Sequence, residues 1–391
     1  MRMLVLGAGL QGTACAFDLL RHSEVTEVRL AGMPIDRLPP FLRAYTAPRF
    51  LPTPVDVRDH DAVRALMREC DAVMCALPYY FNLEMTRLAV ECGVHFCDLG
   101  GNTEIVSQQK ELDEAARNRG ISVIPDCGLA PGMVNILAQH GIEQLDKVDS
   151  VRIYVGGLPQ HPEPPLNYQV VYSLEGVLDY YTTLSWVLRN GQRTQVPALS
   201  EIEPVQFPAP LGELEAFHTA GGLSTLAFRY EGRIPTMEYK TLRYPGHATI
   251  MAALRDLGFF SLEPIQVGGH RVVPREVAVA ILAQRLSKPE GRDLVALRVV
   301  VAGERGGRPV TLIWELVDRY DEEHGVSAMM RCTGYSLAIT GWMQVKGLVN
   351  GTGVRTPDEA VPAPRYIEEL AQRGVRIASR VSEGRPAKDP A

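Results

Sequence analysis

The chain has 391 residues, of which 46% are hydrophobic and 22% are charged, and this composition excludes an intrinsically disordered chain. The length suggests two or three domains. The formal net charge of −6 gives no overall positive field for nucleic acid or anionic lipid, and no segment approaches the roughly 20 apolar residues that cross a bilayer. The seven cysteines form no C-x-x-C pair and are expected to be reduced thiols. We therefore expect a cytoplasmic protein without nucleic-acid or membrane partners.

The first 125 or so residues alternate between short apolar runs and amphipathic segments. Asp59 and either Asn102 or Thr103 are placed to cap two helices, and Gly93 and Gly120 are placed to end two. The predicted strands are 3–6, 27–31, 50–57, 72–77, 94–97 and 121–124, and the predicted helices are 10–22, 59–69, 82–92 and 102–120, with an irregular second crossover at 34–48. Strands joined by crossovers in this way predict an α/β fold with a Rossmann-type, doubly wound, mostly parallel sheet.

The pattern changes after Asp126. Segments with partial alternation are predicted to be longer strands, and the chain becomes helix-like again from about Gly334. The predicted strands of this half are 151–155, 167–172, 222–228, 295–302 and 310–317, the helical segment is 335–346, and the polar residues 383–391 are predicted to fray. We expect a dinucleotide-binding domain at 1–126, an α+β domain at 127–333 and a C-terminal segment at 334–391.

The sequence Gly7-Ala8-Gly9-Leu10-Gln11-Gly12 is a G-x-G-x-x-G motif that follows a predicted strand and opens a predicted helix. Gly7 permits a tight turn, Gly9 lets the backbone approach a pyrophosphate, and Gly12 lets the helix lie close to the strand. The N–H groups at the start of the helix, from Leu10 and Gln11 onward, would bind the phosphates. The same glycines interrupt the apolar N-terminal run, which argues against a signal peptide. The motif predicts a site for a nicotinamide dinucleotide, and the alternative is a tight turn that binds nothing.

The end of the second predicted strand leaves both NAD and NADP open as cofactors. NAD-binding domains usually have an acidic residue there that binds the ribose 2′-hydroxyl, whereas this chain has Ala31, Gly32 and Met33. Small residues leave room for a 2′-phosphate, with which Arg37 could pair. The alternative is that Arg37 is a solvated surface residue.

Further segments follow strands at the edge where doubly wound sheets bind their ligands. The backbone of Ala76-Leu77-Pro78 is expected to lie along the ribose and nicotinamide of the cofactor. Asp98 and Asp126 each follow an apolar strand beside glycines. We expect Asp98 to contact the cofactor and Asp126 to be catalytic, and the alternative for each is a turn-forming or helix-capping role.

The sequence contains the blocks Gly7–Gly12, Ala76–Pro78, Asp126-x-Gly128-x-x-Pro131-Gly132, Tyr172–Gly176, Glu215–Gly222 and Lys240–His247. Together these blocks resemble the saccharopine reductase / lysine 6-dehydrogenase family, from residue 1 to about Gly374. The Leu-Arg-Tyr-Pro-Gly-His block and the moderate length are more similar to the lysine 6-dehydrogenase branch. The resemblance implies that the inserted α+β domain serves substrate binding and dimerisation in a homo-oligomer, and that the C-terminal segment packs back on the first domain. The pair Gly32-Met33 departs from the acid usual in the family's NAD-using members.

The resemblance implies oxidation of a primary amine, with L-lysine as the first candidate. The ε-carbon would lose a hydride to NAD or NADP, water would release ammonia, and the semialdehyde would cyclise to a piperideine carboxylate. Arg243 is suited to bind the substrate α-carboxylate bidentately. His218 and His247 are suited to proton transfer, and Asp126 and Glu175 to bind the ammonium group or act as the base. The alternative for each of these five residues is a structural role.

Two other functions stay open. One is the reductive joining of an amine to an aldehyde, as saccharopine or carboxynorspermidine reductases do. The other is a dinucleotide-binding protein that kept the fold and lost the chemistry. No metal is expected, because Asp321-Glu322-Glu323-His324 is better explained as a charged turn. The expected partner is a small amine or basic amino acid.

Overall fold

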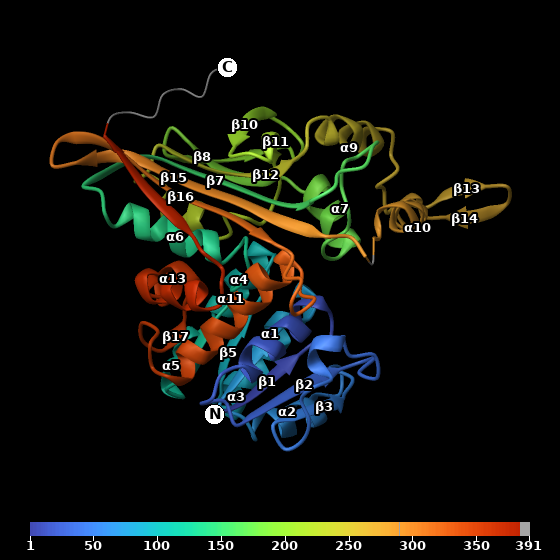
Figure 1. Cartoon of the computed structure of the whole chain (residues 1–391), viewed down its shortest axis with the longest axis vertical. Coiled ribbons are helices and arrows are strands. Elements are labelled where there is room, and N and C mark those ends of the chain that lie inside the picture. The colour runs from blue at the N-terminus through green and yellow to red at the C-terminus, as the bar shows by residue number, and fades with distance from the viewer. Residues whose placement is uncertain (289, 384–391) are drawn as a thin grey trace. The chain divides into compact units, whose positions relative to one another are not determined.

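The computed structural model describes residues 1–288 and 290–383, which divide into two compact units (Figure 1). Unit 1 contains residues 1–143, 224–226 and 321–377, and unit 2 contains the described residues of 144–223, 227–320 and 378–383. Within the described ranges, no helix combines the length and apolar character needed to span a membrane. Except for Glu383, the tail that the sequence predicts to fray lies outside the described residues.

The elements of unit 1 are β1 (Arg2–Leu6), α1 (Leu10–Leu20), β2 (Glu27–Gly32), η1 (Pro40–Leu42), β3 (Phe50–Pro54), α2 (His60–Met67), β4 (Ala72–Cys75), η2 (Tyr79–Phe81), α3 (Asn82–Cys92), β5 (His95–Asp98), α4 (Thr103–Lys110), α5 (Asp113–Asn118), β6 (Ser122–Ile124), α6 (Met133–Ile142), α11 (Ala328–Val345), β17 (Gly353–Val354), α12 (Pro357–Ala360) and α13 (Ala363–Gln372). They form a seven-stranded sheet in the order β17-β6-β5-β4-β1-β2-β3, with every pairing parallel. This confirms the predicted Rossmann-type doubly wound sheet, in which the strand order reverses at β1. The sequence did not indicate β17, which is only two residues long.

Local signals explain where several helices of unit 1 begin and end. The Asp59 carboxylate accepts a hydrogen bond from Ala62 N and caps α2, and the Asn102 side chain caps α4 in the same way. Gly93 ends α3 in the left-handed conformation, with φ of 71°. These caps confirm the predictions for the three residues.

The helix α11 packs against α1 and against the strands β4 and β5. Two glycines permit this close approach. A Cβ at Gly334 would lie 2.7 Å from Ala14 Cβ, and a Cβ at Gly341 would lie 2.4 Å from Met74 Sδ. A segment more than 300 residues from the N-terminus therefore covers part of the parallel sheet of unit 1.

A buried ionic network joins α13 to α1. Arg373 Nε donates to both carboxylate oxygens of Asp18, at 2.8 and 2.9 Å, and Arg373 Nη1 donates to Glu369 Oε2 at 2.6 Å. Arg373 Nη2 also contacts His22 Nε2. The side chains of Asp18 and Glu369 are each only 2% exposed. Asp18 therefore depends on this one guanidinium for compensation of its charge, whereas Glu369 also pairs with Arg365.

The elements of unit 2 are β7 (Lys147–Pro159), α7 (Leu174–Thr182), β8 (Ser185–Arg189), β9 (Gln192–Val196), β10 (Glu203–Phe207), β11 (Gly212–His218), β12 (Thr236–Arg243), α9 (His247–Asp256), β13 (Ile265–Val267), β14 (His270–Val272), α10 (Pro274–Leu286), β15 (Asp293–Arg305), β16 (Arg308–Arg319) and β18 (Ala378–Glu383), and α8 (Leu226–Arg229) begins in unit 1 and ends in unit 2. A nine-stranded mixed sheet follows the path β10-β11-β12-β7-β15-β16-β18, and off this path β8 pairs with β12 and β9 pairs with β8. The strands β13 and β14 form a separate hairpin next to α10 (Figure 1). The predicted α+β architecture of this half is confirmed. The strands β7, β15 and β16 contain the predicted ranges 151–155, 295–302 and 310–317.

Two predicted strands in this half are wrong. Residues 167–172 contain no strand, although Tyr168 and Val171 are buried. Residues 222–228 form turns and the start of α8. The cause lies in the backbone, because Gly221 and Ser224 have φ of 92° and 49°, which no strand accommodates.

Candidate functional site

The glycine turn between β1 and α1 contains glycines of two kinds. Gly7 has φ of 103°, and a Cβ there would lie 2.7 Å from Ala76 O. A Cβ at Gly12 would lie 1.8 Å from Gly7 O. By contrast, a Cβ at Gly9 would meet nothing within 4 Å. Gly7 and Gly12 therefore allow close packing, whereas Gly9 keeps the space beside the start of α1 open.

The N-terminus of α1 is free to bind an anion. Gly9 is its N-cap residue, no side chain caps the helix, and no acidic residue stands in the first turn. Leu10 is 55% exposed, and Gln11 Oε1 is buried without a hydrogen-bond partner among the described residues. Uncapped N–H groups and the positive end of the helix dipole beside an open space fit the pyrophosphate of a dinucleotide.

The end of β2 lies against the glycine turn. Gly7 N donates to Ala31 O at 2.8 Å. A Cβ at Gly32 would lie 3.0 Å from the Ala8 nitrogen, so an acidic side chain at this position would have to displace the turn. Met33 is 68% exposed, and Arg37 is also exposed. Close packing thus explains the missing acid and leaves Arg37 as a candidate partner for a 2′-phosphate.

The segment Ala76-Leu77-Pro78 lies beside Gly7. Ala76 N donates to Leu6 O at 2.8 Å, which extends the pairing of β4 with β1, and Pro78 is the N-cap residue of η2. The structure therefore brings this segment and the glycine turn together at the carboxyl ends of the central strands. Its contact with the cofactor stays a prediction.

Asp98 and Asp126 are buried carboxylates at the same end of the sheet. Asp98 Oδ1 accepts from Gly100 N at 2.7 Å, and its Oδ2 accepts from Gln109 Nε2 at 2.7 Å. Asp126 Oδ2 accepts from Ser224 Oγ, and its Oδ1 accepts from Gly101 N at 3.3 Å. Burial raises the pKa of Asp98 to about 6 and that of Asp126 to about 7, although these hydrogen bonds lower both values. Asp126 therefore exchanges its proton near neutral pH.

The two raised pKa values predict how stability depends on pH. In the unfolded chain both carboxyls ionise near pH 4. Their contribution to stability is therefore fully present below about pH 4 and is lost as the pH rises through about 6 and about 7. A tenfold difference in proton affinity between the folded and unfolded chain corresponds to about 1.4 kcal/mol of stability. We expect Asp126→Asn to flatten this decline in urea unfolding measured from pH 4 to pH 8, and an unchanged slope would contradict the assignment.

In unit 2, Arg243 is a buried cation without a carboxylate partner among the described residues. Arg243 is the last residue of β12 and is 3% exposed. Its guanidinium carbon lies 4.7 Å from the centre of the Tyr168 ring, and Nη1 donates to Leu242 O at 2.8 Å. Arg243 Nε and the Tyr168 hydroxyl are buried and have no hydrogen-bond partner in the described chain. The cluster is therefore suited to an anion, which would bind the guanidinium at the edge that carries Nε.

His247 lies beside this cluster with both ring nitrogens engaged. Nδ1 is 3.1 Å from Leu166 O, and Nε2 is 3.0 Å from the Tyr181 hydroxyl. Burial and the positive charge of Arg243 lower the pKa of His247 to about 3, so the ring is neutral. Nδ1–H then donates to the carbonyl, and Nε2 accepts from Tyr181. The proton-transfer role predicted for His247 stays untested.

Glu215 shows that part of the family block is structural. Its carboxylate accepts hydrogen bonds from Gly246 N at 2.8 Å and from Ala248 N at 2.6 Å. These N–H groups belong to the start of α9. The N-cap residue of this helix is Gly246, which has no side chain that could cap it. Glu215 on β11 therefore caps the helix that begins with His247.

The structure places His218 and Arg243 on opposite faces of the sheet. In the antiparallel pairing of β11 with β12, His218 is opposite Lys240 and Glu215 is opposite Arg243. Paired residues share a face and neighbours along a strand alternate, so His218 lies on the face of Lys240 and away from Arg243. We therefore leave His218 out of the site that contains Arg243.

His218 belongs to an ionic network in which His218 and Glu238 are buried and Glu201 is exposed. His218 Nε2 lies 3.1 Å from Glu201 Oε2, and the ligand atoms of Glu201, His218 and Glu238 all lie within 4.8 Å of one another. Arg189 forms ion pairs with both carboxylates, each at 2.8 Å, and Arg152 also pairs with Glu238. Because guanidinium groups already balance the two carboxylates, the arrangement is better suited to an ionic network than to a metal ion.

The remaining predicted residue, Glu175, lies in the first turn of α7 and is exposed. Within the described chain it has no hydrogen bond or ion pair with Arg243, His247 or Tyr168. An acidic residue at this position favours the N-terminus of the helix, where Ser173 is the capping residue. The structure thus does not bring Glu175 together with the other predicted residues.

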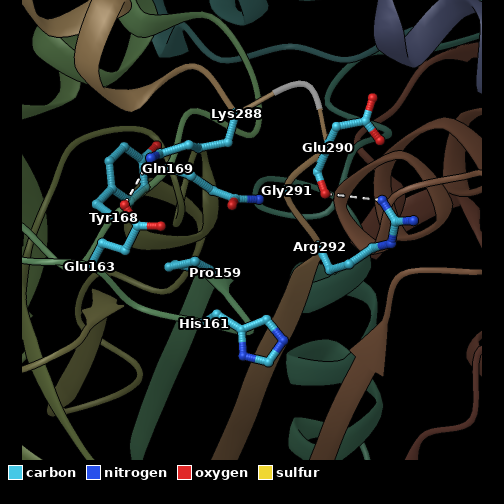
Figure 2. A pocket seen from close by; sticks show the side chains of 9 residues that line it. All are labelled: Pro159, His161, Glu163, Tyr168, Gln169, Lys288, Glu290, Gly291 and Arg292. Carbon is cyan, nitrogen blue, oxygen red and sulfur yellow. Dashed lines mark hydrogen bonds and ion pairs between the residues drawn. The ribbon is translucent and has the colours of Figure 1, made fainter.

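A pocket of about 420 Å³ opens in unit 2 (Figure 2). Tyr168 and Lys288 lie on one side of it, and Glu290 and Arg292 lie on the other. Lys288 Nζ pairs with Glu163 Oε2 at 2.8 Å. The wall therefore combines cationic and anionic groups with Tyr168, the residue whose ring the Arg243 guanidinium contacts. Its lining residues are Pro159, His161, Glu163, Tyr168, Gln169, Lys288, Glu290, Gly291 and Arg292.

Two family models match almost the whole chain. The saccharopine dehydrogenase NADP binding domain matches residues 3–124, and the saccharopine dehydrogenase C-terminal domain matches residues 128–375. The chain belongs to the saccharopine dehydrogenase family. It is a nicotinamide-dependent oxidoreductase, and its N-terminal part is the dinucleotide-binding domain. The predicted family, enzyme class and cofactor type are thereby confirmed.

Individual relatives are distant. The chain is 21% identical to saccharopine dehydrogenase [NADP(+), L-glutamate-forming] of Schizosaccharomyces pombe, over 97% of this chain and 98% of that protein. It is 25% identical to the mitochondrial alpha-aminoadipic semialdehyde synthase of Mus musculus, over 67% of this chain but only 29% of that protein. Its fold is similar to apo saccharopine dehydrogenase of Saccharomyces cerevisiae, with a TM-score of 0.79 at 20% identity, covering 97% of this chain and 99% of that chain.

A second solved structure is similar in fold. It is homospermidine synthase of Legionella pneumophila in complex with NAD, with a TM-score of 0.70 at 11% identity, covering all of this chain and 93% of that chain. At such identities both structural likenesses show the fold alone.

Sequence reasoning missed Ser224, Tyr181 and the capping role of Glu215. The block Glu215–Gly222 ends two residues before Ser224, so Ser224 is part of no motif that could have indicated its role. Tyr181 lies within an amphipathic helix, where a tyrosine is most simply a core residue. Only the pairing of β11 with β12 reveals that Glu215 reaches the start of α9.

Proposed function

We propose that the protein is a dehydrogenase that acts on the amine-bearing carbon of a basic amino acid, with oxidation of L-lysine at the ε-carbon as the first candidate. The observation that carries the proposal is the buried Arg243 guanidinium, which has no carboxylate partner in the described chain and stacks on a tyrosine of the pocket wall. A buried cation of this kind favours an anionic ligand group, and an amino acid supplies an α-carboxylate.

The residues of each unit support one part of this chemistry. In unit 1, the glycine turn and the start of α1 would hold the dinucleotide, which supplies a hydride acceptor when bound. Asp126 would accept the proton of the substrate ammonium group, since only the neutral amine can lose a hydride. In unit 2, Tyr168 and Arg243 would hold the carboxylate, and the acidic residues of the pocket would favour a basic side chain.

A second candidate is the saccharopine type of reaction, in which an amine and an aldehyde are joined reductively. The relatives favour it, because several of them are named saccharopine dehydrogenase. The carboxynorspermidine type belongs to the same reductive class. For the cofactor we propose NADP over NAD, which the matched NADP binding domain and the absence of an acid at Gly32 support. We further propose that the protein is a homo-oligomer and that it is located in the cytoplasm. Light scattering would test the oligomeric state.

A substrate panel distinguishes the candidates. Reduction of NADP or NAD is measured with L-lysine, L-saccharopine and polyamines, and oxidation of NADPH or NADH is measured with amine–aldehyde pairs. Turnover of lysine with release of ammonia supports the first candidate, and turnover of saccharopine with release of an amino acid supports the second. If no amine and no amine–aldehyde pair is turned over with either cofactor, the proposed function is wrong.

Tyr168→Phe is expected to lower kcat/KM for the amino acid about tenfold, because it removes one hydrogen bond to the carboxylate. The loss should appear mainly in KM, and decarboxylated amines such as cadaverine should be affected much less. Tyr154→Phe is the matched control, since its hydroxyl bonds to Glu203 on another part of unit 2. Equal effects on lysine and on cadaverine would contradict carboxylate binding at Tyr168.

A further inference from the structure

Ser224 completes the surroundings of a carboxylate that lies 98 residues away in the chain. Residues 224–226 belong to unit 1, although the chain on both sides of them belongs to unit 2. The Ser224 side chain is 8% exposed, and its hydroxyl donates a hydrogen bond to Asp126 Oδ2. The chain thus contributes one short segment of its second half to the strand-end carboxylate of unit 1.

The backbone is strained on both sides of this hydrogen bond. Asp126 has φ of 65° and Ser224 has φ of 49°, and residues with a Cβ rarely adopt such values. Gly100 leaves room for the Asp126 carboxylate, because a Cβ at position 100 would lie 1.6 Å from Asp126 Oδ1. Strain that persists at a buried polar contact points to a functional constraint on that contact.

We propose that Ser224 is a positioning residue that orients the Asp126 carboxylate and sets the pH at which this carboxylate takes up a proton. The inference rests on the proposed function, in which Asp126 is the proton acceptor. A donor to the carboxylate stabilises its ionised form and so opposes the effect of burial. Asp98 on β5 and Asp358 on α12 also act on Asp126, and both favour its protonated form, whereas Gly101 N favours the ionised form.

The proton step involves only Asp126 and the substrate. The carboxylate takes one proton from R–CH2–NH3⁺, giving the neutral amine and a carboxylic acid, and no electrons are transferred in this step. Ser224 keeps its own proton throughout, so its hydroxyl changes the energy of the ionised carboxylate without exchanging atoms. Loss of the hydroxyl should therefore shift the pH profile and leave the rate at high pH unchanged.

The test compares Ser224→Gly and Ser224→Ala with the wild-type chain. Both variants lack the hydroxyl, and glycine also accepts the positive φ without strain. The acidic limb of the kcat/KM–pH profile should move upward by about one pH unit in both variants, because a charge-assisted hydrogen bond is lost. Ser185→Ala is the control, since it removes a buried hydroxyl that donates to the carbonyl of Thr219 at 3.0 Å. Its limb should not move.

Two results would overturn the inference. One is an acidic limb that stays in place in both variants, and the other is a loss of rate that is equal at every pH. If the wild-type chain turns over no amine and no amine–aldehyde pair, the proposed function fails, and the role of Ser224 is then decided by unfolding. The pH-dependent decline in stability should extend about one pH unit higher in Ser224→Gly than in the wild type. An identical decline in the two proteins would also overturn the inference.

Discussion

Replacing Gly9 by aspartate is expected to weaken the binding of NADPH and NADH on the order of 100-fold or more, while unit 1 stays folded. A Cβ at Gly9 meets nothing within 4 Å, so the apo protein can accommodate the new side chain. The added carboxylate would occupy the open space beside the start of α1 and repel the pyrophosphate. Fluorescence or calorimetric titration measures the affinity, and thermal unfolding reports the fold.

Two other glycines provide comparisons for this variant. Gly120→Asp adds the same charge to unit 1 at a left-handed position with nothing within 4 Å, and its affinity for the cofactor should equal that of the wild type. Gly12→Ala should instead damage the fold, since its Cβ would lie 1.8 Å from Gly7 O. If Gly9→Asp bound the cofactor as tightly as Gly120→Asp does, the glycine turn would not be the phosphate site.

Arg373→Met is expected to destabilise unit 1 by about 3–5 kcal/mol. The substitution leaves Asp18, whose side chain is 2% exposed, without its guanidinium partner. Glu369, also 2% exposed, loses Arg373 and keeps only its pair with Arg365. Methionine fills most of the volume, so the loss measures the unpaired charges rather than a cavity. Urea unfolding followed by circular dichroism gives the change in the midpoint.

The matched control for this variant is Arg58→Met. The Arg58 side chain is 79% exposed and lies 4.0 Å from Asp56, so its removal should leave the unfolding midpoint unchanged. A second comparison is the triple variant Asp18→Asn, Glu369→Gln, Arg373→Met, which removes the unpaired charges and should recover part of the stability. Equal midpoints for Arg373→Met and Arg58→Met would show that the buried network does not stabilise the fold.

Unit 1 could be predicted from the sequence because its signals are local. The apolar runs, the caps at Asp59 and Asn102, and the glycine turn each involve residues a few positions apart. The seventh strand β17 could not be predicted, because two residues carry no periodic pattern and their place is set by pairing with β6. The partial alternation of residues 222–228 predicts a strand, whereas the backbone there is set by the positive φ of Gly221 and Ser224.

The site in unit 2 was harder to predict because strand register decides it. His218 and Arg243 both lie in blocks shared with the family, and the sequence suggested one site for both. The pairing of β11 with β12 separates them by an odd number of positions, which places them on opposite faces. Tyr168 meets Arg243 from a segment without regular structure, so no local pattern could connect the two residues.

The division of unit 1 into three separate stretches of chain affects how the protein is made. Residues 1–143 contain six of the seven parallel strands, but α11 and β17 lie within residues 321–377. A ribosome therefore releases the nucleotide-binding sheet long before the helix that covers part of it has been synthesised. During that interval an apolar surface of the nascent chain is exposed to solvent, which makes it a substrate for chaperones. No single cut in the gene yields either unit as an intact fragment, so engineered truncations must keep the whole reading frame from β1 to β18.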